Sequence, residues 1–176
     1  SWSGNLVTFA SAKHGWLNEG FTSYVENRIV ESVYGKDVSD MEYVIARNAL
    51  RDSIAGMPEA TQALAVKPGT ELDADDALSA VAYDKGAWFL QFLEQRFGRE
   101  NFDAFLRGYF DHFAFQSITT EQFLDYAKAN LFDTYPDTVT DAEIQEWVYA
   151  PGIPSYAPQV MSRNFGIVDS ARLAWL

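Results

Sequence analysis

The stretch 16–34 constrains the fold of this 176-residue chain most, because its apolar residues repeat with the period of an α-helix. The residues that recur at four-residue steps are Phe21, Val25, Ile29 and Val33. They share one face of a helix, and that face should pack inward. Gly35 follows directly, and a glycine in this position commonly ends a helix. We therefore predict one long amphipathic helix around which the other elements are arranged.

Two carboxylates lie on one side of this predicted helix. Glu19 and Glu26 are seven residues apart, which is almost two helical turns. Glu19 lies in the first turn, where the positive end of the helix dipole stabilises a negative charge. An ionised carboxylate on a rigid helix, supported by a second acid, suits a metal site. The alternative is that Glu19 only stabilises the start of the helix and that Glu26 is solvated.

Further helices are predicted from capping signals and apolar periodicity. The pairs that match a capping box are Ser39 with Glu42, Thr119 with Gln122 and Thr140 with Glu143. Asn101 is a further candidate N-cap. The expected helices are 16–34, 39–54, 81–97, 101–113, 119–131 and 140–150. Between them, 56–76 shows no helical pattern, so we predict an all-α fold of about six helices with one long irregular loop.

Composition excludes several classes of partner. The net charge of -12 argues against nucleic acid and anionic membranes, since both need basic patches. No apolar run is long enough for a membrane span. The chain has no cysteine, so neither disulfides nor a thiolate metal site are expected. The compartment stays open, with the cytoplasm slightly favoured, and the lack of an initiator Met leaves room for a signal peptide in a parent protein.

The sequence W-L-N-E-G-F-T-S-Y-V-E at 16–26, together with S-W-S-G-N-L-V-T at 1–8, resembles a known enzyme family. It is similar to the zinc aminopeptidases of the gluzincin class, which include aminopeptidase N and leukotriene A4 hydrolase. The resemblance implies the helical lobe of a thermolysin-like metallopeptidase catalytic domain. It also implies that Glu19 is a zinc ligand and that the HExxH motif, with the other two zinc ligands, ends directly before Ser1. Glu26 would then accept a hydrogen bond from a zinc-binding histidine.

A second motif, Y-D-K-G at 83–86, matches the same family. There the tyrosine donates a hydrogen bond to the oxyanion that forms when water attacks the scissile carbonyl. The resemblance thus implies that Tyr83 is catalytic, and a neutral phenol is a suitable donor. Without the motif, Tyr83 would be interpreted as an amphipathic core residue. Asp75 matches an acid of the leukotriene hydrolase branch, but Leu78 stands where that branch has a tyrosine, so epoxide hydrolysis is not predicted.

The expected function is therefore that of part of a zinc-dependent aminopeptidase. The intact enzyme would use one zinc ion and a metal-activated water to remove N-terminal residues from peptides. Residues 1–153 would belong to its catalytic domain, and 154–176 would be a linker and the start of a following helical domain. We expect the 176-residue chain alone to be inactive and to bind no zinc tightly, because it lacks HExxH. His14 is expected in a surface loop and His112 in a packing or surface position.

The alternative is a non-catalytic α-helical interaction module whose aromatic stripes bind a partner. The residues before Ser1 in the parent gene distinguish the two hypotheses. An HExxH motif there indicates the enzyme, and any other sequence favours a degenerate scaffold.

Overall fold

The computed structural model describes residues 2–65 and 79–175. Its α-helices are α1 (Trp2–Leu6), α2 (Trp16–Tyr34), α3 (Lys36–Ala55), α5 (Gly86–Phe97), α6 (Arg99–His112), α7 (Thr120–Ala127), α8 (Asp141–Tyr149) and α9 (Arg163–Ala174). Short 3-10 turns form at η1 (Ala12–His14) and η2 (Glu59–Thr61), and π-helical turns at η3 (Val81–Lys85) and η4 (Lys128–Phe132). The all-α prediction is confirmed. Asp75, Leu78 and most of the predicted loop 56–76 lie outside the described residues.

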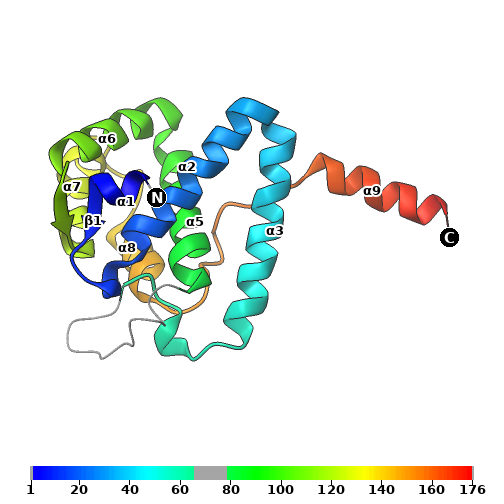
Figure 1. Ribbon diagram of the computed structural model, residues 1–176, viewed down its shortest axis with the longest axis horizontal. Coiled ribbons are helices and arrows are strands. Elements are labelled where there is room, and N and C mark those ends of the chain that lie inside the picture. Colours follow the sequence, from blue (N-terminus) through cyan, green and yellow to red (C-terminus); the bar gives the residue numbers. More distant parts are fainter. Residues whose placement is uncertain (1, 66–78, 176) are drawn as a thin grey trace.

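Helix α2 lies at the centre of the molecule, as the sequence predicts. It packs against α3, α5, η3 and α1 (Figure 1). Helices α6, α7 and α8 complete the body, and α9 projects from it beyond α3. None of the helices in residues 2–65 and 79–175 is long and apolar enough to cross a membrane.

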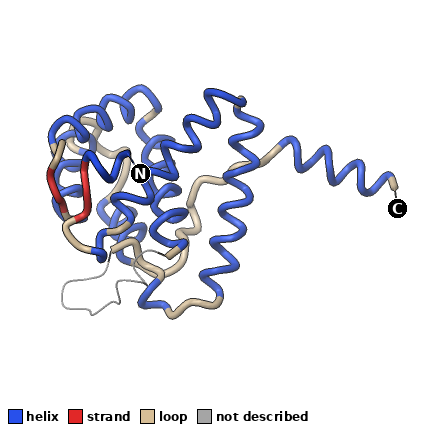
Figure 2. Tube along the Cα trace, in the orientation of Figure 1, coloured by secondary structure: helices blue, strands red, loops and turns tan. Residues whose placement is uncertain are grey.

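Two short parallel strands join distant parts of the chain. Strand β1 (Val7–Phe9) pairs in parallel with β2 (Gln116–Ile118), and Thr8 lies opposite Ser117 (Figure 2). The pair holds the segment before α2 against the turn between α6 and α7. It was not predicted from the sequence, because three residues are too few to establish an alternating pattern.

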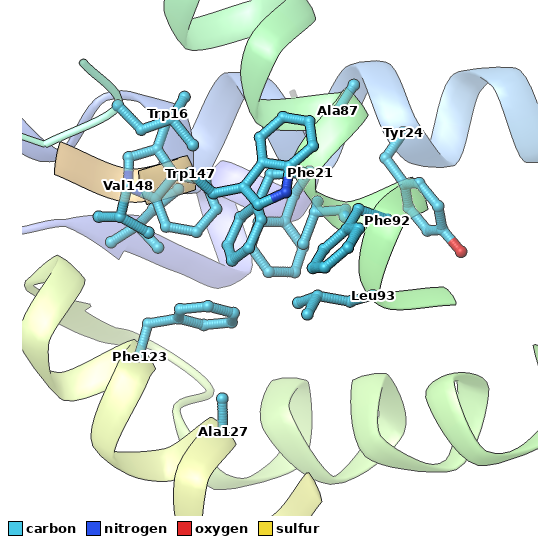
Figure 3. Close-up of a cluster of buried hydrophobic side chains, with 14 of the residues drawn as sticks. Trp16, Phe21, Tyr24, Ala87, Phe92, Leu93, Phe123, Ala127, Trp147 and Val148 are labelled. Atoms are coloured by element: carbon cyan, nitrogen blue, oxygen red, sulfur yellow. The ribbon is translucent and has the colours of Figure 1, made fainter. Parts of the chain in front are cut away.

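The core is an aromatic cluster to which several helices contribute. Phe21 of α2 stacks on Tyr109 of α6 with ring centroids 5.0 Å apart, and Trp16 meets Phe123 of α7 edge to face at 5.2 Å. Figure 3 shows side chains of α2, α5, α7 and α8 converging on this region. The labelled residues are Trp16, Phe21, Tyr24, Ala87, Phe92, Leu93, Phe123, Ala127, Trp147 and Val148. Aromatic pairs at these distances add to the stabilisation by apolar burial.

The predicted apolar face of α2 is correct only for the first half of the helix. Phe21 is 1% exposed and Val25 is partly buried against the core, but Ile29 and Val33 are 54% and 64% exposed. Tyr24 is buried although it does not belong to the predicted apolar face. Periodicity identifies a face of a helix, but it does not tell how far along that face a neighbouring element extends.

Ion pairs hold the middle of α2 where the apolar contacts end. Arg28 donates two hydrogen bonds to Asp103 of α6, at 2.9 and 3.0 Å. The Tyr24 hydroxyl donates to Glu94 of α5 at 2.5 Å, and Arg99 bridges Glu94 and Glu31. Two guanidinium groups thus connect three carboxylates on three helices. A network of this kind contributes more than isolated surface pairs do.

The helix starts divide into two groups. The capping boxes at Thr119 and Thr140 are both present, as predicted. Ser39 is no cap, because α3 begins directly after Gly35, which adopts a φ of 90°, and the Ser39 hydroxyl instead donates to the Asn27 carbonyl at 3.3 Å. Asn101 is likewise inside α6, which begins after Gly98 with a φ of 80°. At both positions a glycine with positive φ turns the chain, so the helix begins earlier than the predicted polar cap.

Candidate functional site

The structure brings Glu19 and Tyr83 together. Glu19 lies in the first turn of α2, and Tyr83 lies in the π-helical turn η3 that precedes α5. Partial burial, followed by the charge of Glu19 and a hydrogen bond to its carboxylate, raises the pKa of Tyr83. The phenol is still 38% exposed. A protonated hydroxyl and a carboxylate therefore face one another at a surface that a substrate could reach.

Two glycines create this arrangement. Gly20 follows Glu19, Gly86 follows the turn that carries Tyr83, and the two backbones touch where α2 crosses the start of α5. A Cβ built on Gly20 would lie 2.8 Å from the Gly86 Cα and 3.2 Å from the Ala82 carbonyl oxygen. Side chains at this crossing would force the helices apart. The glycines of the two sequence motifs thus allow Glu19 and Tyr83 to meet.

Substitution of Gly20 by alanine should destabilise the chain by about 1–3 kcal/mol, because the methyl group meets main-chain atoms that have no freedom to move away. Urea unfolding of the chain measures this effect. Gly166→Ala is the matched control, since Gly166 lies inside α9 and a Cβ added there would meet nothing within 4 Å. That control should gain about 0.5–1 kcal/mol from helix propensity. Equal stability of Gly20→Ala and wild type would rule out the close crossing.

Polar residues on either side of Glu19 tie α2 to the elements before it. The Asn18 Oδ1 accepts a hydrogen bond from the Phe9 amide at 2.9 Å, which fixes the end of β1. The Thr22 hydroxyl donates to the Asn18 carbonyl at 2.7 Å and lies 2.8 Å from the Ser3 hydroxyl of α1. The motif residues next to Glu19 therefore determine where α1 and β1 lie relative to it.

His14 lies in the short turn η1 and is partly exposed, as expected for a loop residue, and it also has a structural role. Its Nδ1 accepts a hydrogen bond from the Thr120 amide at 3.1 Å, and the Trp16 indole donates to the Thr120 hydroxyl at 3.0 Å. Burial lowers the pKa of His14, which keeps the ring neutral and Nδ1 available as an acceptor. His112 stacks on Tyr126 at 4.9 Å, as expected for a packing histidine.

Glu26 lies on α2, seven residues after Glu19. It is exposed on α2, and residues 2–65 and 79–175 offer it no hydrogen bond or ion pair. Its expected contact with a zinc-binding histidine stays a prediction, as do the roles of Glu19 and Tyr83.

Among the described residues, Glu19 is the one candidate metal ligand at this site. Within the described parts of the chain, no three His, Cys, Asp or Glu side chains lie close enough together to hold a metal ion. Glu19 itself fits a ligand role, because its carboxylate is partly exposed and its partner is a neutral phenol rather than a cation. A metal ion at this position would need further ligands from outside the described residues.

Two buried polar residues beside the site were not predicted from the sequence. They are Lys85 and Gln62, which are 0% and 8% exposed. Lys85 belongs to the Y-D-K-G motif that contains Tyr83, so its place next to the candidate site is visible in the sequence, but its burial is not. Gln62 had no local signal, since its partners come from other parts of the chain.

Comparison with known proteins places the chain in a family. The model of the Peptidase family M1 domain matches residues 1–147. Leucine aminopeptidase 2 of Yarrowia lipolytica is 42% identical over 168 residues, an alignment that covers 88% of this chain and 25% of that protein. The structure of native leukotriene A4 hydrolase from Saccharomyces cerevisiae superimposes with a TM-score of 0.89 at 35% identity, covering 99% of this chain and 28% of that one.

A mutant of a two-domain M1 zinc metallopeptidase bound to L-arginine is also similar, with a TM-score of 0.70 at 26% identity over 90% of this chain and 33% of that one. The chain spans about a quarter of the length of the curated relatives it matches. The family match extends over most of the chain and includes both motifs that meet at Glu19 and Tyr83. The chain therefore belongs to peptidase family M1.

Proposed function

We propose that this chain is the helical part of the catalytic domain of a zinc aminopeptidase, an enzyme that hydrolyses N-terminal residues from peptides. Membership of family M1 supports an enzyme over a non-catalytic interaction module. The names of its relatives, a leucine aminopeptidase and a zinc metallopeptidase, support the reaction and the metal. Residues 1–153 would belong to the catalytic domain, and 154–176 would lead into a following helical domain.

The proximity of Glu19 to Tyr83 is the observation on which this proposal depends. Glu19 would be one of three protein ligands of zinc, and two histidines outside the described residues would be the others. When bound, zinc would activate a water for attack on the peptide carbonyl. Tyr83 would then turn its hydroxyl from Glu19 to the oxyanion of the tetrahedral intermediate and stabilise the negative charge that develops there.

Glu26 would support the same centre from one side. It projects from the same helix as Glu19, and its carboxylate has no partner among the described residues. It could therefore accept a hydrogen bond from the free ring nitrogen of a ligating histidine and fix the orientation of that ring.

Removal of the metal tests the proposed function. The full-length protein should hydrolyse an aminoacyl anilide, lose this activity on treatment with a strong zinc chelator, and regain it with about one equivalent of zinc. Magnesium at the same concentration serves as the control and should not restore activity, because a site with imidazole ligands favours zinc. Activity that survives complete chelation, or no activity in the zinc-loaded protein, would contradict the proposal.

A further inference from the structure

Lys85 is a fully buried lysine two residues after Tyr83. Its side chain is 0% exposed, and its ammonium donates to the main-chain carbonyl oxygens of Gln62 at 2.9 Å and Ala150 at 2.8 Å. Burial lowers the pKa of Lys85 to about 8, against the opposing charge of Glu146. Lysine is rarely buried this completely unless its donors are satisfied. This position therefore requires hydrogen-bond donors as well as apolar volume.

The two carbonyls belong to segments that are distant in the sequence. Gln62 follows η2, and Ala150 ends α8. The Gln62 amide extends the connection, because it donates to the Met57 carbonyl at 2.8 Å and accepts from the Gly152 amide at 3.0 Å. We call Gln62, Lys85, Ala150 and Gly152 the Lys85 node. It joins the segment after α3, the turn η3 and the end of α8 at one buried point.

The turn that carries Tyr83 has an unusual backbone conformation. Val81–Lys85 is π-helical, a rare conformation that occurs mostly as single turns and frequently at functional sites. Within this turn Val81, Ala82 and Lys85 are buried, whereas Tyr83 is 38% exposed. Among the described residues, the Glu19 carboxylate is the one group whose charge and hydrogen bonding raise the pKa of the Tyr83 phenol. The position of the phenol is thus set mainly by the backbone of η3.

We propose that Lys85 is a positioning residue, which holds η3 through the Lys85 node so that the Tyr83 hydroxyl lies beside Glu19. It acts from the buried side of the turn, and Tyr83 acts from the exposed side. Without its two hydrogen bonds, no polar contact among the described residues would hold η3 against Gln62 and Ala150, and the phenol would shift relative to the reacting carbonyl. This inference rests on the proposed function of Tyr83.

Kinetics of Lys85→Met in the full-length protein test the proposal, because methionine keeps the apolar volume and removes the donors. We expect kcat for an aminoacyl anilide to fall about 10- to 100-fold, with KM and zinc content nearly unchanged. In a Tyr83→Phe background the same substitution should change kcat by less than about twofold, since Lys85 would act only through the phenol. An unchanged kcat for Lys85→Met, or an equal loss in both backgrounds, would overturn the proposal.

Arg28→Met is the control for general destabilisation. Arg28 joins α2 to Asp103 of α6 and has no bond to η3, so this variant should lower the melting temperature while kcat at 25 °C stays within about twofold of wild type.

If Lys85→Met does not fold, Gln62→Leu replaces it and should show a smaller loss of kcat that also disappears in the Tyr83→Phe background. An unchanged kcat in Gln62→Leu would then overturn the proposal. Failure of the proposed function is distinguished from these outcomes, because in that case Tyr83→Phe alone would keep full activity.

Discussion

Replacement of Tyr83 by phenylalanine in the full-length protein should lower kcat about 100- to 1,000-fold, because the loss of one oxyanion donor costs ~2.7–4 kcal/mol of transition-state stabilisation. The ring and its packing are kept, so KM and zinc content should change little. The raised pKa of Tyr83 implies that wild type donates from a protonated phenol across the neutral range. Initial rates on an aminoacyl anilide, with zinc content measured on the same samples, provide the test.

Tyr135→Phe is the matched control for this prediction. Tyr135 is 38% exposed, as Tyr83 is, and its hydroxyl donates to Asn101 at 2.9 Å, in a part of the chain that has no bond to Glu19. Removal of this hydroxyl should leave kcat unchanged. Wild-type turnover in Tyr83→Phe would refute the donor role, and an equal loss in both variants would indicate a general effect on the fold.

Replacement of Glu19 by glutamine should abolish most activity at limiting zinc. The substitution keeps the size of the side chain and an oxygen that can accept the Tyr83 hydrogen bond, but it removes the negative charge that binds a divalent cation. Loss of a partner outside the ligand set already costs about 10–100-fold in metal affinity, so loss of a ligand should cost more than about 100-fold. Rates measured over a series of free zinc concentrations should show a large shift of the midpoint to higher zinc.

Two further variants, Glu26→Gln and Glu42→Gln, show whether the shift in the zinc midpoint depends on which carboxylate is removed. Glu26 would orient a ligating histidine, so its loss should shift the midpoint by only about 10–100-fold. Glu42 is exposed on α3, and its replacement should shift nothing. A shift for Glu26→Gln that equals or exceeds that for Glu19→Gln would reverse the assigned roles.

Local chemistry made much of the fold predictable, and long-range contacts account for the errors. The Thr119 and Thr140 caps depend on side chains that bond to backbone three residues away, so the pattern alone identifies them. Ser39 offers the same pattern, yet the chain turns at Gly35, because α2 and α3 pack side by side with only this residue between them. The exposure of Ile29 and Val33 and the pairing of β1 with β2 likewise depend on where distant segments end.

The candidate site was predictable to the extent that its residues lie in motifs. Glu19 and Tyr83 were identified from their neighbours in the sequence, and the structure brings them together. The contact between Gly20 and Gly86 could not be derived, because a glycine in a helix gives no indication of which backbone approaches it. Lys85 could not be identified as buried, since a lysine beside a helix start is normally solvated and only the carbonyls of Gln62 and Ala150 explain its position.

The zinc content of the purified full-length Glu19→Gln variant, after dialysis against metal-free buffer, is the most direct test of the claim that Glu19 is a metal ligand. We predict that wild type and Tyr83→Phe keep about one zinc ion per chain under these conditions, and that Glu19→Gln keeps almost none. Full zinc occupancy in a folded Glu19→Gln protein would contradict the claim.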